Sequence, residues 1–170
     1  MPTYFPVRRM GITLDEEEFI ARKLAQYRTE DGILDLGCGN CLITNRLSKT
    51  WGKKIVAVDL WDEFPMQLAL QNAREEGASI EVGKIERPTL RLPFPNGSFS
   101  FVYSVMFVYN LRKEERQNLF SEVSRVLSDK GLFLLVDPVI VRRERRELVG
   151  FQQVSYQEEN ALFYLLSKKG

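Results

Sequence analysis

The chain has 170 residues, a net charge of +1, 44% apolar residues and 28% charged residues. This composition is typical of a soluble globular domain, and the near-zero net charge gives no global sign of binding to nucleic acid or to an anionic membrane. No apolar run approaches the roughly 18 residues of a membrane span, and the first residues lack the basic-then-apolar pattern of a signal peptide. We therefore expect a cytoplasmic protein with one domain over residues 1–170, made of an N-terminal segment and helix (1–30) and a core (31–170).

The chain contains no histidine, which excludes Ser-His-Asp or Cys-His catalysis and every His-ligated metal. Its only cysteines, Cys38 and Cys41, have the C-x-x-C spacing of redox pairs and of half a metal site. A structural zinc site usually needs four ligands, and no further cysteine or histidine is available. We predict no metal and two cysteines that fill a tight turn, with redox or metal chemistry as the alternative.

The first thirty residues divide into an irregular segment, 1–12, and a helix. Thr13 opens this helix, and Glu16 three residues later completes a capping box. The acidic residues 15–18 suit the first turn because of the helix dipole, and we expect them to be solvated. Helical spacing predicts that an apolar stripe faces the core: Ile20, Leu24 and Tyr27.

Predicted strands and helices alternate from residue 33 onward. The predicted strands are 33–36, 55–58, 78–82, 98–105, 132–136, 150–155 and 161–166. The predicted helices are 42–49, 65–76 and 110–127, the last one ended by Gly131. The alternation predicts an α/β fold with a doubly wound, mostly parallel sheet and helices on both faces. Two consecutive strands at the end of the chain require an antiparallel pair.

A tight glycine turn organises the predicted sheet. The apolar strand 33–36 runs into Gly37-Cys38-Gly39, and the next strand ends at Asp59. In an open α/β sheet such a junction is where a nucleotide-like ligand binds. The dinucleotide fingerprint requires a third glycine, but that position is Leu42.

Four stretches in the same order resemble the motifs of class I S-adenosylmethionine-dependent methyltransferases, above all the methyltransferase type 11 group. They are the strand and glycine turn 33–39, the second strand with its acid 55–60, the L-P-F-P-N-G-S-F stretch 92–99 and the R-V-L-S-D-K-G turn 125–131. The resemblance implies a Rossmann-like seven-stranded sheet with a C-terminal antiparallel hairpin. It also implies S-adenosylmethionine as cofactor and methyl transfer by direct displacement.

The resemblance assigns roles to residues around the glycine turn. Asp35 would offset the methionine ammonium, Asp59 would accept both ribose hydroxyls, and Leu60 and Trp61 would flank the adenine. The glycines let the backbone approach the ligand. The implied cofactor-binding set is Asp35, Gly37, Cys38, Gly39, Asn40, Asp59, Leu60, Trp61, Lys84, Ile85 and Ser104.

Two departures from the family pattern bear on this assignment. Lys84 stands where the family usually has an acid that accepts from the adenine amino group, and lysine has no acceptor. The segment 104–110 replaces an acid-x-x-His-His pattern. An Asn/Asp-Pro-Pro-Tyr motif is absent, which argues against exocyclic base amines as acceptors.

Methyl transfer from a sulfonium needs positioning more than acid–base chemistry. Candidate catalytic residues near the expected methyl group are Tyr103, Tyr109, Asn110 and Asp137. Tyr4 could close over the cofactor from the N-terminal segment. Ordinary packing is the alternative role for each of these residues.

The resemblance implies a methyl acceptor, either a small molecule or a macromolecule, and a homodimer or second subunit could complete its pocket. The basic run 142–146 is expected to be a solvated helix, with a phosphate-bearing partner such as nucleic acid as the alternative. The main competing hypothesis is a non-catalytic cofactor-binding module that serves as a partner subunit. A dehydrogenase is a more distant one.

Overall fold

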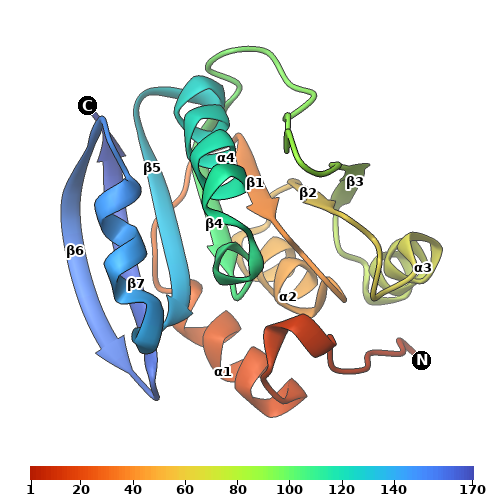
Figure 1. Ribbon diagram of the computed structural model, residues 1–170. Coiled ribbons are helices and arrows are strands. Elements are labelled where there is room, and N and C mark those ends of the chain that lie inside the picture. Colours follow the sequence, from red (N-terminus) through yellow and green to blue (C-terminus); the bar gives the residue numbers. More distant parts are fainter.

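The computed structural model describes residues 1–170. Seven strands form one sheet in the order β3-β2-β1-β4-β5-β7-β6 (Figure 1). The strands are β1 (Ile33–Leu36), β2 (Ile55–Asp59), β3 (Ile80–Lys84), β4 (Phe99–Val105), β5 (Leu127–Pro138), β6 (Phe151–Glu159) and β7 (Leu162–Lys169). The five neighbouring strands β3, β2, β1, β4 and β5 run parallel to one another, whereas β7 is antiparallel to both β5 and β6. The predicted doubly wound sheet with its C-terminal hairpin is confirmed.

Helices cover both faces of the sheet. The α-helices are α1 (Leu14–Leu24), α2 (Leu42–Trp51), α3 (Met66–Glu76) and α4 (Lys113–Val126). Three 3-10 helices are η1 (Arg8–Met10), η2 (Val108–Asn110) and η3 (Val139–Glu147). None of the helices combines the length and the apolar character that a membrane crossing requires.

Alternation along the strands divides the apolar interior into two cores. Ile33 of β1 faces the core shared with α1 and α2, whereas its neighbour Leu34 faces the core shared with α4. This follows from the period of two in a strand, and burial on both faces explains the continuous apolar runs in the sequence. Figure 1 shows α4 and η3 together on one face of the sheet.

The end of α4 differs from the sequence prediction. The helix stops at Val126, and Leu127 is already extended and pairs with Phe99 of β4. Gly131 therefore lies inside β5 rather than at the helix end, after a bulge at which Lys130 has a φ of 64°. A Cβ at Gly131 would lie 2.8 Å from the Ser128 carbonyl oxygen, so this bulge requires glycine.

Other boundaries move by a few residues. The hairpin turns at Asn160 and Ala161, both with positive φ, so the segment 157–159 belongs to β6 rather than to the loop. Pro65 precedes α3 instead of opening it, and residues 108–110 form the separate helix η2 before α4 begins. These differences reflect strand pairing and turn geometry, which local periodicity does not specify.

The capping box at the start of α1 yields a test of local stability. The Thr13 Oγ1 accepts from the Glu16 N–H at 3.1 Å, and the Thr13 N–H donates to Glu16 Oε1 at 3.1 Å. We expect Thr13→Ala to lower the free energy of unfolding by about 1 kcal/mol. Thr50→Ala, an exposed site late in α2, is the matched control and should change it by less than about 0.5 kcal/mol. Equal effects of the two changes in urea unfolding would contradict a role for the cap.

Candidate functional site

The carboxyl ends of β1, β2 and β4 meet at the point where the strand order reverses, which is where open α/β sheets bind ligands. The turn after β1 is fixed to β2, because the N–H groups of Gly37 and Cys38 both donate to the Val58 carbonyl, at 2.8 and 3.2 Å. Gly37 and Gly39 have φ values of 76° and 58°, which glycine adopts without strain. The predicted turn therefore lies directly beside the predicted acid, Asp59.

Asp59 is the centre of this site. Its carboxylate is 1% exposed and accepts from the backbone N–H groups of Gly39 (2.8 Å) and Trp61 (2.9 Å). The Arg9 guanidinium donates to both of its oxygens, at 2.5 and 3.2 Å. Asp59 thus receives four hydrogen bonds, two of them from one bidentate cation, an arrangement that is both strong and directional.

Arg9 is held on three sides. Its side chain is only 10% exposed, its Nη2 also donates to the Gly37 carbonyl at 3.2 Å, and its guanidinium carbon lies 5.0 Å from the centre of the Phe107 ring. The Phe107 ring in turn covers Gly37, where a Cβ would lie 2.1 Å from the ring. The space in front of the glycine turn is therefore filled by the chain's own side chains.

Asp35 lies behind the turn, on the α2 side of the sheet. Its carboxylate is buried and accepts from the Thr44 hydroxyl at 2.7 Å. Burial raises the pKa of Asp35 to about 7, an effect that the hydrogen bond from Thr44 opposes. Asp35 therefore carries a partial negative charge near neutral pH. Its predicted role toward the ammonium stays a prediction.

The residues predicted to hold the adenine are brought together at the ends of β2 and β3. The Trp61 indole N–H donates to the Gly83 carbonyl at 2.9 Å, and the Ile85 N–H donates to the Asp59 carbonyl at 3.1 Å. The side chain of Ile85 lies in the α4 core, whereas Leu60 is half-buried. Lys84 points to solvent, 3.7 Å from Glu86, so its ammonium makes no contact with this site.

Asn40 connects the turn to the N-terminal region. Its Oδ1 accepts from the Leu42 N–H at 2.9 Å, and its Nδ2 donates to the Phe5 carbonyl and to Glu17 Oε2, both at 3.1 Å. Ser104 of β4 is fully buried, with no partner for its hydroxyl. Asn40 therefore organises the turn, whereas nothing in its surroundings assigns a role to Ser104.

The four candidate catalytic residues are not gathered in one place. Tyr103 is buried with Asp35 on the α2 side, and Asp137 is buried on the α4 side with neither carboxylate oxygen hydrogen-bonded. Burial, together with Glu144, raises the pKa of Asp137 well above its ordinary value. The Tyr109 hydroxyl and the Asn110 Nδ2 both donate to the Arg9 carbonyl. Tyr109 and Asn110 alone among the four candidates adjoin the Arg9–Asp59 pair.

The sequence predicts that Glu17 is solvated with the other acids of residues 15–18, and this prediction is wrong. Unlike its neighbours it is 1% exposed, and burial raises its pKa to about 7. The signal was present, because Glu17 precedes Ile20 and Leu24 at helical spacing and so shares their inward face. Sequence reasoning also missed Arg9, for which no local pattern exists, because Asp59 lies fifty residues away.

The cysteines behave as packed residues of the turn. Cys38 and Cys41 are buried free thiols, and burial raises the pKa of Cys38 well above its usual value. A thiol of this kind is poorly reactive. Cys41 has a φ of 61° at the start of α2, a conformation that favours glycine.

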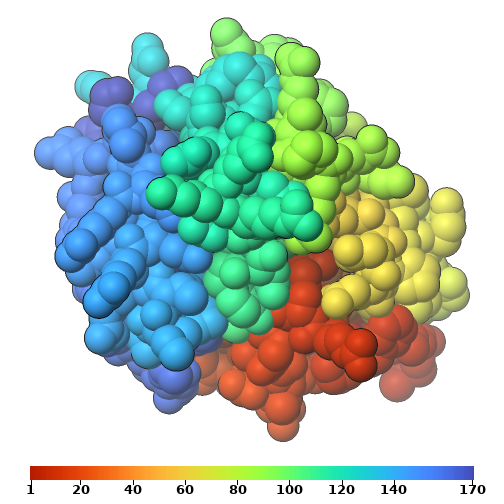
Figure 2. All heavy atoms as spheres, viewed as in Figure 1, coloured from red at the N-terminus to blue at the C-terminus, as the bar shows by residue number.

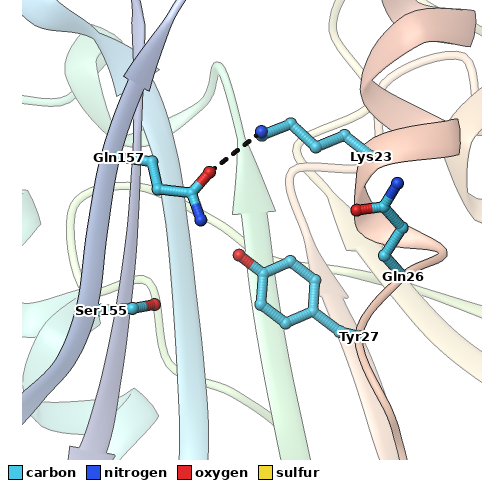
Figure 3. Close-up of a pocket in the computed structure, with 5 residues that line it drawn as sticks. All are labelled: Lys23, Gln26, Tyr27, Ser155 and Gln157. Atoms are coloured by element: carbon cyan, nitrogen blue, oxygen red, sulfur yellow. Dashed lines mark hydrogen bonds between the residues drawn. The ribbon is translucent and has the colours of Figure 1, made fainter.

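A surface hollow lies elsewhere on the molecule, between α1 and β6 (Figure 3). It has a volume of about 220 Å³, and it is lined by Lys23, Gln26, Tyr27, Ser155 and Gln157. The Lys23 ammonium crosses it to Gln157 Oε1 at 3.1 Å. None of these residues belongs to the glycine turn or contacts Asp59, so this hollow is separate from the candidate site.

The raised pKa of Asp35 predicts how stability depends on pH. The folded chain binds a proton at Asp35 up to about pH 7, whereas an unfolded aspartate releases it near pH 3.8. The stabilising contribution of this carboxyl is therefore complete below pH 3.8 and is lost as the pH rises through 7. The Asp35→Asn variant lacks this loss. As the pH rises from 5 to 8, we therefore expect its free energy of unfolding to increase relative to that of the wild type, by on the order of 1 kcal/mol.

Urea unfolding at several pH values measures this effect. Asp31→Asn serves as the control, because the Asp31 side chain is 96% exposed, and its effect should not vary over the same range. A difference between the Asp35→Asn variant and the wild type that stays constant with pH would contradict the assignment.

Comparisons with known proteins show the family and the fold of the chain. A family model described as a methyltransferase domain matches residues 33–131, which is more than half of the chain. An uncharacterized methyltransferase of Bacillus subtilis, YcgJ, is 33% identical over 119 residues, which span 68% of this chain and 44% of that protein. The match spans between 21% and 55% of the length of such curated relatives.

Solved structures share the fold. A SAM-dependent methyltransferase from Aquifex aeolicus has a TM-score of 0.73 and 18% identity, covering 91% of this chain and 90% of that one. The [4+2]-cyclase SpnF has a TM-score of 0.77 and 15% identity, covering 89% and 80%. Both likenesses are below 25% identity and show that this chain has the same fold. By the family model and the YcgJ relative, the chain belongs to the methyltransferase-domain family.

Proposed function

We propose that this chain transfers a methyl group from S-adenosylmethionine to an acceptor by direct displacement, in the cytoplasm. One observation supports the proposal most. Asp59 is anchored by two backbone N–H groups and turns both oxygens toward a single group with two donors, now the Arg9 guanidinium. Two vicinal ribose hydroxyls are a donor pair of the same kind.

The polar groups of the site suit this cofactor, but the space in front of them is filled. Asp59, the Gly37 carbonyl and the buried Asp35 offer acceptors to the ribose and to cationic groups. Arg9, Phe107 and the residues around them occupy the room that the cofactor would need. The bound cofactor would supply an activated sulfonium methyl group, and the chain would supply binding and orientation.

Acceptor recognition would fall to residues beside the Arg9–Asp59 pair. Tyr109 and Asn110 follow β4 beside the site, and we assign them to contact with the acceptor rather than to proton transfer. Tyr103 and Asp137 are fully buried on opposite sides of the sheet, which favours structural roles for both.

The second candidate is a cofactor-binding module without turnover that serves as a partner subunit. One observation favours it: side chains of the chain itself, Arg9 and Phe107, lie against the glycine turn. SpnF, a protein with the same fold, is named as a [4+2]-cyclase, so the fold alone does not determine the activity. Turnover by the isolated chain on any small acceptor would exclude this candidate, whereas a stoichiometric partner that confers activity would support it.

Titration with S-adenosylhomocysteine tests the cofactor site itself. We expect Asp59→Ala to weaken binding by roughly tenfold or more, because a hydrogen bond to a charged group is worth roughly 1.5–3 kcal/mol. Asp31→Ala, at the far end of β1, is the matched control and should bind like the wild type. Equal affinity of the Asp59 variant and the control would remove Asp59 from the site, and no binding at millimolar ligand would refute the proposed function.

A further inference from the structure

Residues 3–10, which we call the N-terminal strap, cross the ligand-binding edge of the sheet from α3 to η2. Figure 2 shows the N-terminal region, in red, lying between the yellow side of the molecule, where α3 lies, and the green segment that follows β4. Polar contacts hold both ends of the strap. Thr3 and Asn72 of α3 exchange two hydrogen bonds, of 3.0 and 2.7 Å, and Asn110 of η2 donates to the Arg9 carbonyl at 3.0 Å.

The middle of the strap is packed against the glycine turn. Val7 and Met10 are 1% and 2% exposed, and a Cβ at Gly39 would lie 3.2 Å from the Val7 Cγ2 and 3.3 Å from the Met10 sulfur. The Phe5 carbonyl accepts from the side chain of Asn40, the residue directly after the glycine turn. The strap therefore lies on the backbone that the cofactor would approach.

Arg9 engages the same acceptors that a nucleoside would need. The Arg9 guanidinium donates to both oxygens of Asp59 and to the carbonyl of Gly37. The backbone N–H of Arg9 donates to Glu63 Oε2 at 2.9 Å. Because Asp59 cannot serve two bidentate donors at once, Arg9 and a ribose exclude one another.

We propose that the strap is an internal competitor of the cofactor and that Arg9 is the group that closes the site. This inference rests on the proposed function, since it takes the nucleoside of S-adenosylmethionine as the displaced ligand. Only the molecules with the strap undocked bind, so the apparent dissociation constant is the intrinsic one divided by the undocked fraction. Displacing the strap is a condition for binding.

Removing Arg9 should therefore tighten binding rather than weaken it. Without Arg9, the buried Asp59 carboxylate of the docked form loses its charge partner, which is strongly destabilising. In the undocked form water solvates Asp59, so the loss of Arg9 does not destabilise that form. Arg9→Met keeps an unbranched apolar side chain that can still contact Phe107 while it removes the charge and the donors. The matched control is Arg8→Met, since Arg8 is its exposed neighbour in η1.

The experiment is a titration of the wild type and both variants with S-adenosylhomocysteine, together with amide hydrogen exchange of Arg9 and Met10. We expect Arg9→Met to bind at least tenfold more tightly than the wild type and Arg8→Met to bind like the wild type. In the wild type we expect the ligand to speed exchange of both amides, which are hydrogen-bonded in the docked strap, to Glu63 and to the Val7 carbonyl.

Two outcomes would overturn the inference in different ways. If the wild type binds but Arg9→Met binds equally or more weakly, or if the ligand protects the strap amides, Arg9 is a ligand-binding residue or a bystander and the strap is no competitor. If neither the wild type nor Arg9→Met binds at millimolar ligand, the proposed function fails, and the competition fails with it. The wild-type titration separates the two cases.

Discussion

The bidentate ion pair between Arg9 and Asp59 is the interaction on which this site depends. A carboxylate that is 1% exposed must be compensated, since a buried charge without partners is among the costliest features of a fold. Two backbone N–H groups supply part of that compensation, and Arg9 supplies the rest. When Arg9 leaves, water or a ligand with two donors must take its place, which gives the site two discrete states.

The buried Asp35 near this pair follows from the same charge balance. Burial raises the pKa of Asp35 to about 7, so Asp35 does not add a full negative charge near Asp59 at neutral pH. The charge of Asp59 raises the pKa of Asp35, whereas the charge of Arg9 lowers it. Departure of Arg9 would therefore favour the protonated form of Asp35, unless a cationic ligand replaced the guanidinium. A sulfonium with an ammonium group has the right charge for that replacement.

Sequence patterns predicted the features that depend on local order. The parallel strands, the glycine turn and the place of Asp59 follow from apolar runs, from glycine spacing and from the alternation of strands with helices. The start of β5 at Leu127 was not predictable in this way, because the pairing of Leu127 with Phe99 ends α4 five residues before Gly131.

The contents of the site were less predictable than its position. Arg9 reaches Asp59 only through the tertiary fold, and residues 1–12 carry no periodicity that would place them over the turn. Phe107 looked like one apolar residue among several after β4, yet its ring covers Gly37. A family resemblance describes the groups that bind a cofactor. It does not describe which other side chains of this chain lie against those groups.

The most direct measurement is a crystal structure of the chain bound to S-adenosylhomocysteine, compared with the free protein. The expected result is that the Asp59 carboxylate accepts both ribose hydroxyls while the Arg9 guanidinium and the Met10 side chain have left the glycine turn. A ligand bound at this edge of the sheet while Arg9 still donates to both oxygens of Asp59 would contradict the claim that Arg9 and the ribose compete for Asp59. A ligand bound away from Asp59 would contradict the assignment of the site.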